Sequence, residues 1–219
     1  MSTQEIIKRY SEVNADANLS CGGNLNYLAL KPGEKVLDLG SGRGSEALEA
    51  AFLVGPGGFV WGLDLTPMMI EAAQEQASSV GVKNVEFVLS SIEQIPFRAE
   101  SIDALISNCV INHVADKLVV YQEIYRVLRP GGRFVVSDIM TEEPLPKSIK
   151  EDPEAIAACF GGAISVKEYE DILGLAGFPE IDIFQERHYL KNEYEMISRT
   201  FRGRKPGTSS IEHRTSITG

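Results

Sequence analysis

Short apolar runs alternate with longer amphipathic segments through the first two thirds of the chain. The apolar runs predict five β-strands, at residues 36–39, 59–63, 85–88, 104–106 and 133–138. The segments between them predict helices at residues 46–52, 68–77 and 117–128. Alternating strands and helices are typical of a parallel sheet that carries helices on both faces. The pattern therefore predicts an α/β fold with a doubly wound sheet.

The pattern changes after the fifth predicted strand. Residues 141–153 are rich in proline and charge and predict a loop, followed by short helices at 155–159 and 167–176 and a strand at 181–184. Residues 1–30 are mostly polar and predict a helical start followed by a glycine-rich loop around Cys21. Residues from 207 onward are expected to be disordered.

A glycine-rich loop follows the first predicted strand. Asp38-Leu39-Gly40-Ser41-Gly42-Arg43-Gly44 places three glycines at alternate positions, and the second strand ends at Asp64. Glycines let the backbone approach a ligand closely, and an acidic residue roughly 20 positions further on accepts hydrogen bonds from ribose hydroxyls. A dinucleotide site prefers glycine where this chain has Ser45. The loop therefore predicts an adenosine-containing cofactor without deciding which one.

Composition and charge argue against several classes of function for this chain. The 219 residues suit one α/β domain with a modest extension, and a net charge of −10 argues against nucleic acid as the main partner. We expect neither a transmembrane helix nor a signal peptide, because apolar runs are short and the start is polar. An odd number of cysteines, three, favours a cytoplasmic location with free thiols.

Five segments in order along the chain resemble the class I S-adenosylmethionine-dependent methyltransferases. They are Asp38 to Gly44, Asp64 with Leu65, Ile92 to Phe97, Ser101 to Asn108, and Leu128 to Gly132. The resemblance implies a Rossmann-like, mostly parallel seven-stranded sheet with one reversed strand at its edge and a small C-terminal substrate cap. It also implies S-adenosylmethionine as the cofactor.

The same resemblance implies which residues hold the cofactor. Asp64 would bind the ribose, Ile92 and Glu93 would lie beside the adenine, and the end of the fourth strand would face the methionine part. Ser91 stands where the family usually has an acidic residue, so an adenine contact is either lost or taken over by the hydroxyl. The full expected set is Asp38, Gly40, Ser41, Gly42, Gly44, Asp64, Leu65, Ser91, Ile92, Glu93 and Asn108.

The three cysteines all fall in predicted loops or strand ends. Cys21 precedes the first strand, Cys109 follows the fourth, and Cys159 lies beyond the fifth. Each could be a small buried apolar residue, which is the usual role of a single cysteine. Cys109 lies at the carboxyl ends of the strands, where this fold class binds ligands, and the expected position of all three near one rim favours a thiol site instead.

The chain also closely resembles the arsenite methyltransferases, over roughly residues 18 to 206. The matching segments are Ser20 to Asn24, Gly62 to Met68, Ser107 to Asn112, Ser137 to Ile139, and Cys159 to Ala163. This resemblance implies that Cys21, Cys109 and Cys159 bind trivalent arsenic and act in catalysis. His113 departs from the family, where an apolar residue is more usual.

The chemistry agrees with these residue types. Soft thiolates suit a soft centre such as trivalent arsenic. Its lone pair can attack a sulfonium methyl group without a general base, whereas an oxygen or nitrogen substrate usually needs one. His113 is the only nearby candidate base, and Asp116 is expected only to start the following helix. The expected substrates are arsenite and methylarsenite, with a thiol reductant such as glutathione or thioredoxin as partner.

Two alternatives remain open at this point. A small-molecule O- or N-methyltransferase of biosynthesis would keep its activity without Cys109 and Cys159. A non-catalytic, thiol-based metalloid-binding protein would bind arsenic without cofactor turnover. We expect one division of the chain. It comprises residues 1–30 (N-terminal helix and cysteine loop), 31–140 (cofactor-binding core), 141–206 (substrate cap and edge strands) and 207–219 (disordered tail).

Overall fold

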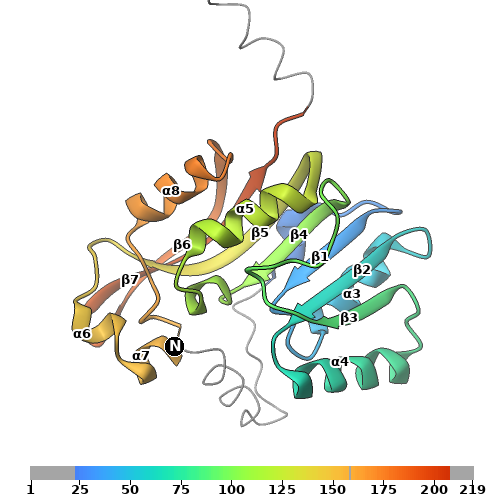
Figure 1. Ribbon diagram of the computed structural model, residues 1–219, viewed down its shortest axis with the longest axis horizontal. Helices are drawn as coiled ribbons and strands as arrows, with labels where there is room; N and C mark the ends of the chain where they lie inside the picture. The colour runs from blue at the N-terminus through green and yellow to red at the C-terminus, as the bar shows by residue number, and fades with distance from the viewer. Residues whose placement is uncertain (1–22, 158, 208–219) are drawn as a thin grey trace, which may run out of the picture.

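The computed structural model describes residues 23–157 and 159–207, whose strands form one seven-stranded sheet (Figure 1). The strand order is β3-β2-β1-β4-β5-β7-β6. Strands β1 to β5 are parallel, and β7 runs antiparallel to both of its neighbours. The strands are β1 (Lys35–Leu39), β2 (Phe59–Asp64), β3 (Val85–Leu89), β4 (Ile102–Asn108), β5 (Leu128–Thr141), β6 (Ile181–Lys191) and β7 (Tyr194–Arg204).

The doubly wound, mostly parallel seven-stranded sheet is confirmed, with one difference at its end. The reversed strand β7 lies second from the edge, not at the edge as expected. Strands β6 and β7 form a hairpin around Asn192 and Glu193, both of which have positive φ angles, of 50° and 67°. The hairpin inserts β7 between β5 and β6, so β6 takes the edge.

Helices cover both faces of the sheet (Figure 1). The predicted loop at 141–153 contains the one-turn helix α6, and the helix predicted at 155–159 ends at Ala157, so Cys159 lies in the following turn. Asp116 caps α5 by accepting hydrogen bonds from the N–H groups of Leu118 and Val119, as expected. The helical segments are α2 (Leu25–Leu28), α3 (Ser45–Val54), α4 (Pro67–Val80), the 3-10 turn η1 (Ile111–His113), α5 (Lys117–Val127), α6 (Lys147–Lys150), α7 (Pro153–Ala157) and α8 (Val166–Leu175).

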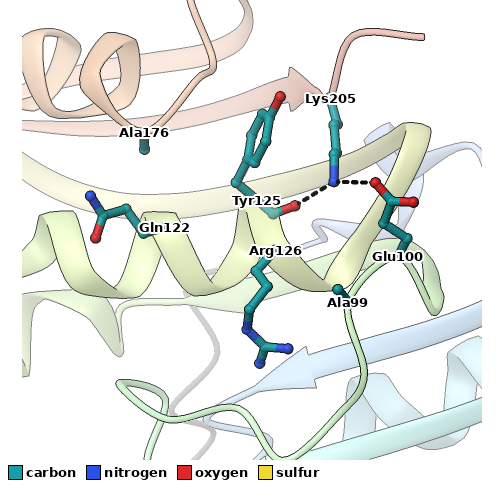
Figure 2. Close-up of a pocket in the computed structure, with 7 residues that line it drawn as sticks. All are labelled: Ala99, Glu100, Gln122, Tyr125, Arg126, Ala176 and Lys205. Carbon is teal, nitrogen blue, oxygen red and sulfur yellow. Dashed lines mark hydrogen bonds and ion pairs between the residues drawn. The ribbon is translucent and has the colours of Figure 1, made fainter. Parts of the chain in front are cut away.

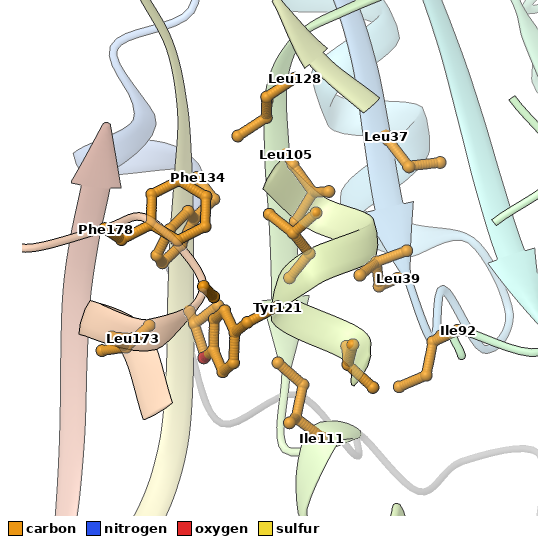
Figure 3. Packing of buried hydrophobic residues seen from close by; sticks show 14 of the residues in the cluster. Leu37, Leu39, Ile92, Leu105, Ile111, Tyr121, Leu128, Phe134, Leu173 and Phe178 are labelled. Atoms are coloured by element: carbon orange, nitrogen blue, oxygen red, sulfur yellow. The ribbon is translucent and has the colours of Figure 1, made fainter. Parts of the chain in front are cut away.

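Successive residues of the central strands enter opposite halves of the core. Leu37 of β1 packs with Leu105, Tyr121 and Phe134 beneath α5 and α8 (Figure 3), whereas Val36 packs on the α3 and α4 side. A parallel strand buried on both faces reads as a continuous apolar run, which explains why these strands could be predicted. Within the described ranges, no helix is long and apolar enough to cross a membrane.

Candidate functional site

The loop between β1 and α3 has the backbone that its glycines predict. Gly40, Gly42 and Gly44 all have positive φ angles. A Cβ atom added to Gly40 would lie 2.7 Å from the Val110 side chain, whereas one added to Gly42 would meet nothing within 4 Å. Gly40 therefore permits close packing within the protein, and Gly42 leaves open space where a ligand's atoms could lie.

Asp64 joins this loop to the end of β2. Its carboxylate accepts hydrogen bonds from the N–H groups of Gly42 and Thr66, each at 2.9 Å. Ser41 N donates to Leu63 O (2.8 Å), while the buried Ser41 Oγ has no hydrogen-bond partner among the described residues. The structure thus brings the glycine loop and the acid at the end of β2 together, beside the half-buried Leu65 and an unsatisfied hydroxyl.

The expected adenine segment follows β3 at the same edge of the sheet. Ser90 N donates to Asp64 O at 3.0 Å, which holds the end of β3 against the end of β2. Ile92 is buried in the core, Glu93 is exposed, and Glu93 N donates to Ser91 Oγ at 3.2 Å. The Ser91 hydroxyl therefore fixes the local turn, and its interaction with an adenine stays a prediction.

Three carboxyl groups gather around the glycine loop. Burial raises the pKa of Asp38, with a further increase from the nearby charges of Glu46 and Asp64. Burial also raises the pKa values of Glu46 and Asp64 themselves. A bound cation would relieve this repulsion and favour the ionised carboxylates. Together with the unsatisfied Ser41 hydroxyl, the cluster fits a ligand that carries hydroxyl groups and positive charge.

Glu46 was not predicted from the sequence as a site residue. It lies in the first turn of α3, and Asn108 Nδ2 at the end of β4 donates a short hydrogen bond to its carboxylate. An acidic residue directly after the glycine loop was the available signal, because such side chains are favoured near helix N-termini. Asn108, expected to face the methionine part, therefore lies beside the carboxyl cluster.

The short turn η1 follows Cys109 in the chain and contacts the loop that carries Cys159. Cys109 directly follows β4, and its N–H donates to Ser137 O on β5 at 2.8 Å. Four residues later, His113 Nε2 lies 3.3 Å from Cys159 Sγ. A Cβ added to Gly162 would overlap the carbonyl of Asn112, so the loop that carries Cys159 packs closely on η1. The fold thus brings two of the three expected cysteines to one region.

Both cysteines have unusual backbone geometry. The φ angles are +53° at Cys109 and +66° at Cys159, in a region that non-glycine residues rarely adopt and that costs about 1–3 kcal/mol. Such conformations persist where the surrounding contacts impose them. Cys109 is disulfide-bonded in the structure, so the expectation of free thiols is wrong at this position. Cys21 lies outside the described residues.

A buried polar group that the sequence did not predict lies at the end of β5. Asp138 accepts a hydrogen bond from Tyr169 Oη at 3.0 Å, and Tyr169 Oη lies 2.7 Å from Tyr121 Oη. Burial raises the pKa of Asp138 to about 6, although the nearby charge of Lys117 acts in the opposite direction. The folded protein therefore holds a proton on Asp138 in a pH range where the unfolded chain has released it.

This difference predicts a specific pH dependence for Asp138→Asn. Between the unfolded pKa near 4 and the folded pKa near 6, the folded state binds more protons, so wild-type stability falls as pH rises. Relative to wild type, Asp138→Asn should gain about 2 kcal/mol in unfolding free energy between pH 4.5 and pH 7.5. Urea unfolding at the two pH values measures this difference. A difference that does not change with pH would contradict it.

A separate hollow of about 380 Å³ lies by the C-terminal end of α5 (Figure 2). Its lining includes Ala99 and Glu100, which precede the amino end of β4, whereas Cys109 follows the carboxyl end of the same strand. The Nζ atom of Lys205 there donates to Tyr125 O, Leu128 O and Glu100, so this cation is already satisfied. Because ligands of parallel α/β sheets bind at the carboxyl ends of the strands, we assign no function to this hollow.

Comparison with known proteins agrees with this geometry. Residues 30–177 match a family model described as a methyltransferase domain. The chain is 39% identical over 203 residues to the arsenite methyltransferase of Halobacterium salinarum, covering 88% of this chain and 52% of that protein. It is 38% identical over 152 residues to the human arsenite methyltransferase, covering 65% of this chain and 40% of that protein. The chain thus spans about half the length, or less, of these relatives.

A solved structure supports the same assignment. The crystal structure of CrArsM, an arsenic(III) S-adenosylmethionine methyltransferase from Chlamydomonas reinhardtii, has a TM-score of 0.77 and 30% sequence identity to this chain. The similarity covers 93% of this chain and 74% of that one. One conclusion follows from the glycine loop joined to Asp64, from the seven-stranded sheet with its reversed strand, and from these relatives. The chain belongs to the arsenite methyltransferase family of the S-adenosylmethionine-dependent methyltransferases.

Proposed function

We propose that this protein transfers the methyl group of S-adenosylmethionine to trivalent arsenic bound by Cys21, Cys109 and Cys159. One observation carries the proposal: Val110, the neighbour of Cys109, packs directly against Gly40 of the glycine loop. On the other side of Cys109, Asn108 bonds to Glu46 of the carboxyl cluster. These two contacts support the proposal that the thiol region and the expected cofactor loop belong to one site.

The cofactor part of the proposal rests on the glycine loop and its carboxylates. S-adenosylmethionine supplies a methyl group on a positively charged sulfur. Asp64 offers oxygen acceptors to ribose hydroxyls, and Gly42 leaves room for the cofactor beside the backbone. The paired charges of Asp38 and Glu46 favour a cationic ligand. Ser91, Ile92 and Glu93 would then border the adenine from the end of β3.

The substrate part of the proposal rests on the thiols. Each thiol that binds arsenite replaces a hydroxyl group, and the thiol proton leaves with that hydroxyl as water. The arsenic lone pair attacks the sulfonium methyl group: the As–C bond forms as the C–S bond breaks, and S-adenosylhomocysteine leaves. The arsenic becomes formally pentavalent, and two electrons from a thiol reductant return it to the trivalent state. The site therefore needs alignment of the reactants and no general base. His113 Nε2 lies 3.3 Å from Cys159 Sγ, which supports a role for His113 as a packing neighbour of this thiol.

The redox state of Cys109 supports a requirement for a reductant. A disulfide-bonded cysteine cannot bind arsenic, because the thiolate is the ligand. We therefore propose that a thiol reductant such as glutathione or thioredoxin acts before each arsenic-binding step. This requirement fits a reducing cytoplasm and a role in arsenic detoxification. We further propose that residues 141–206, which include Cys159, serve as the substrate cap.

One assay tests the proposal directly. The reduced protein is incubated with arsenite, S-adenosylmethionine and a dithiol, and the arsenic species are then separated by chromatography. Methylarsenicals and S-adenosylhomocysteine should appear together. Arsenic binding without S-adenosylhomocysteine would favour a binding protein, and neither binding nor product would favour a methyltransferase of another small molecule.

Cys21 should matter most for the first methylation. Arsenite has three exchangeable positions, whereas methylarsenite has one position already occupied by carbon and needs only two thiols. Cys21→Ser should therefore lower the initial rate with arsenite at least 10-fold and leave the rate with methylarsenite within about twofold. Ser20→Ala is the matched control and should change neither rate. Equal losses on both substrates would contradict this division of roles.

A further inference from the structure

Asn24 lies at the start of the described chain yet is completely buried, at 0% exposure. A buried amide has to be hydrogen-bonded, because an unsatisfied polar group costs about 1–3 kcal/mol. Its Nδ2 donates to Ser107 O at 2.9 Å and to Asn108 Oδ1 at 2.8 Å. Its Oδ1 accepts a hydrogen bond from Ser137 Oγ. The side chain therefore uses both of its donors and its acceptor.

All three partners of Asn24 flank Cys109. Ser107 and Asn108 are the two residues before it in the chain. Ser137 on β5 accepts the hydrogen bond from the Cys109 N–H through its carbonyl oxygen. Asn24 thus contacts β4 and β5 at the two positions that fix the Cys109 backbone.

Cys21 is tied to the same point by the covalent chain. It precedes Asn24 by three residues, and three residues span at most about 11 Å when fully extended. Any conformation of the intervening segment therefore keeps Cys21 within about that distance of Asn24. Without the Asn24 anchor, more residues would separate Cys21 from the nearest fixed point of the chain, and Cys21 could lie further from the strand ends.

The anchor also contacts the carboxyl cluster. Asn108 accepts from Asn24 through Oδ1 and donates to Glu46 through Nδ2, so its amide orientation is fixed from both sides. Ser137 Oγ in turn lies 2.6 Å from Thr200 Oγ1 on β7. Five side chains, those of Glu46, Asn108, Asn24, Ser137 and Thr200, thus form a continuous polar row that runs from α3, beside the glycine loop, to β7.

We propose that Asn24 is a positioning residue of the thiol site: its buried amide anchors the chain, three residues after Cys21, at the strand ends beside Cys109, and so limits how far Cys21 can lie from Cys109. The inference rests on the proposed function, since it assigns Asn24 a role in assembling the three-thiol site. It does not make Asn24 a catalytic residue, because nothing requires Asn24 to touch arsenic or the cofactor.

The first test measures thiol proximity without arsenic or cofactor. In a Cys159→Ser background, Cys21 and Cys109 are the two remaining cysteines. Glutathione disulfide oxidises the pair to one disulfide and is itself reduced to two glutathione molecules, so the equilibrium reports the effective concentration of one thiol at the other. Asn24→Ala should lower this equilibrium constant at least 10-fold, or about 30 mV in potential. Asn26→Ala, an exposed asparagine two positions further on, should leave it within twofold.

The second test uses methylation in the protein with all three cysteines. Asn24→Ala should reproduce the Cys21→Ser pattern, with at least a 10-fold loss on arsenite and a loss below threefold on methylarsenite. The double variant with Cys21→Ser should be no slower than Cys21→Ser alone, because both changes remove the same thiol from the site. A purely structural role would lower both rates and would add to the effect of Cys21→Ser.

A milder variant keeps the inference testable if Asn24→Ala does not fold. Ser137→Ala removes the donor to Asn24 Oδ1 and keeps both bonds donated by Nδ2, so it should shift the glutathione equilibrium in the same direction by about threefold. An equilibrium within twofold of the parent for both Asn24→Ala and Ser137→Ala overturns the inference, as do equal losses on the two substrates. If Asn24→Ala lowers the equilibrium constant but the wild-type protein methylates no arsenic, the positioning role of Asn24 is supported and the proposed function is contradicted.

Discussion

Cys109→Ser and Cys159→Ser should each lower the rate of arsenite methylation at least 100-fold, which corresponds to about 3 kcal/mol in the activation free energy. A serine hydroxyl is close in size to a thiol but is a poor ligand for a soft centre. The same loss is expected with methylarsenite, because two thiols are needed for either substrate. Initial rates with both substrates, in the presence of a dithiol, measure the effect.

The contact between Cys159 and His113 makes Cys159→Ser a selective test of the thiol, because the variant removes the sulfur and can keep the contact. A hydroxyl at position 159 can still hydrogen-bond to His113 Nε2, now 3.3 Å from the sulfur, so the cap loop should stay on η1. The affinity for S-adenosylmethionine should remain within about threefold of wild type. Near wild-type rates on both substrates would overturn the arsenic assignment and favour a methyltransferase of another small molecule.

The central strands could be predicted because they are buried and therefore consist mostly of apolar residues. Strands β1 and β4 are buried almost throughout, and their buried residues are apolar apart from Asp38 in β1 and Ser107 in β4. Strand β6 was predicted only at 181–184, because most of its remaining residues are exposed and polar at the edge of the sheet. Strand β7 has no apolar run, since charged residues such as Arg199 and Arg202 lie in it and form ion pairs with β6. Only the family resemblance supplied a seventh strand.

The candidate site also has parts that the local sequence predicts and parts that it does not. The glycine loop and Asp64 form a local motif with a fixed spacing, and the structure brings them into contact. Asn24 and Asp138 could not be predicted, because their roles depend on partners that are distant in sequence, such as Ser137 and Tyr169. A polar residue in an apolar context gives no indication of which partner satisfies it until the fold is known.

Asp64→Ala should weaken S-adenosylmethionine binding about 100-fold. The substitution removes the expected charge-assisted acceptor for ribose hydroxyls and also the acceptor for the N–H groups of Gly42 and Thr66. Loss of a hydrogen bond to a charged group costs about 1.5–3 kcal/mol, which agrees with a change of this size. Asp64→Asn keeps one acceptor oxygen and should weaken binding only about 10-fold. Titration calorimetry with S-adenosylmethionine measures both affinities.

Asp103→Ala is the matched control for this experiment. Asp103 also accepts a hydrogen bond from a backbone N–H, that of Lys35 at 2.7 Å, but at the amino end of β1. It additionally forms an ion pair with Arg129. Its removal should lower stability without changing cofactor affinity, because the glycine loop lies at the opposite end of β1. Unchanged affinity in Asp64→Ala, or a preference for NAD over S-adenosylmethionine in the wild type, would contradict the proposed cofactor site.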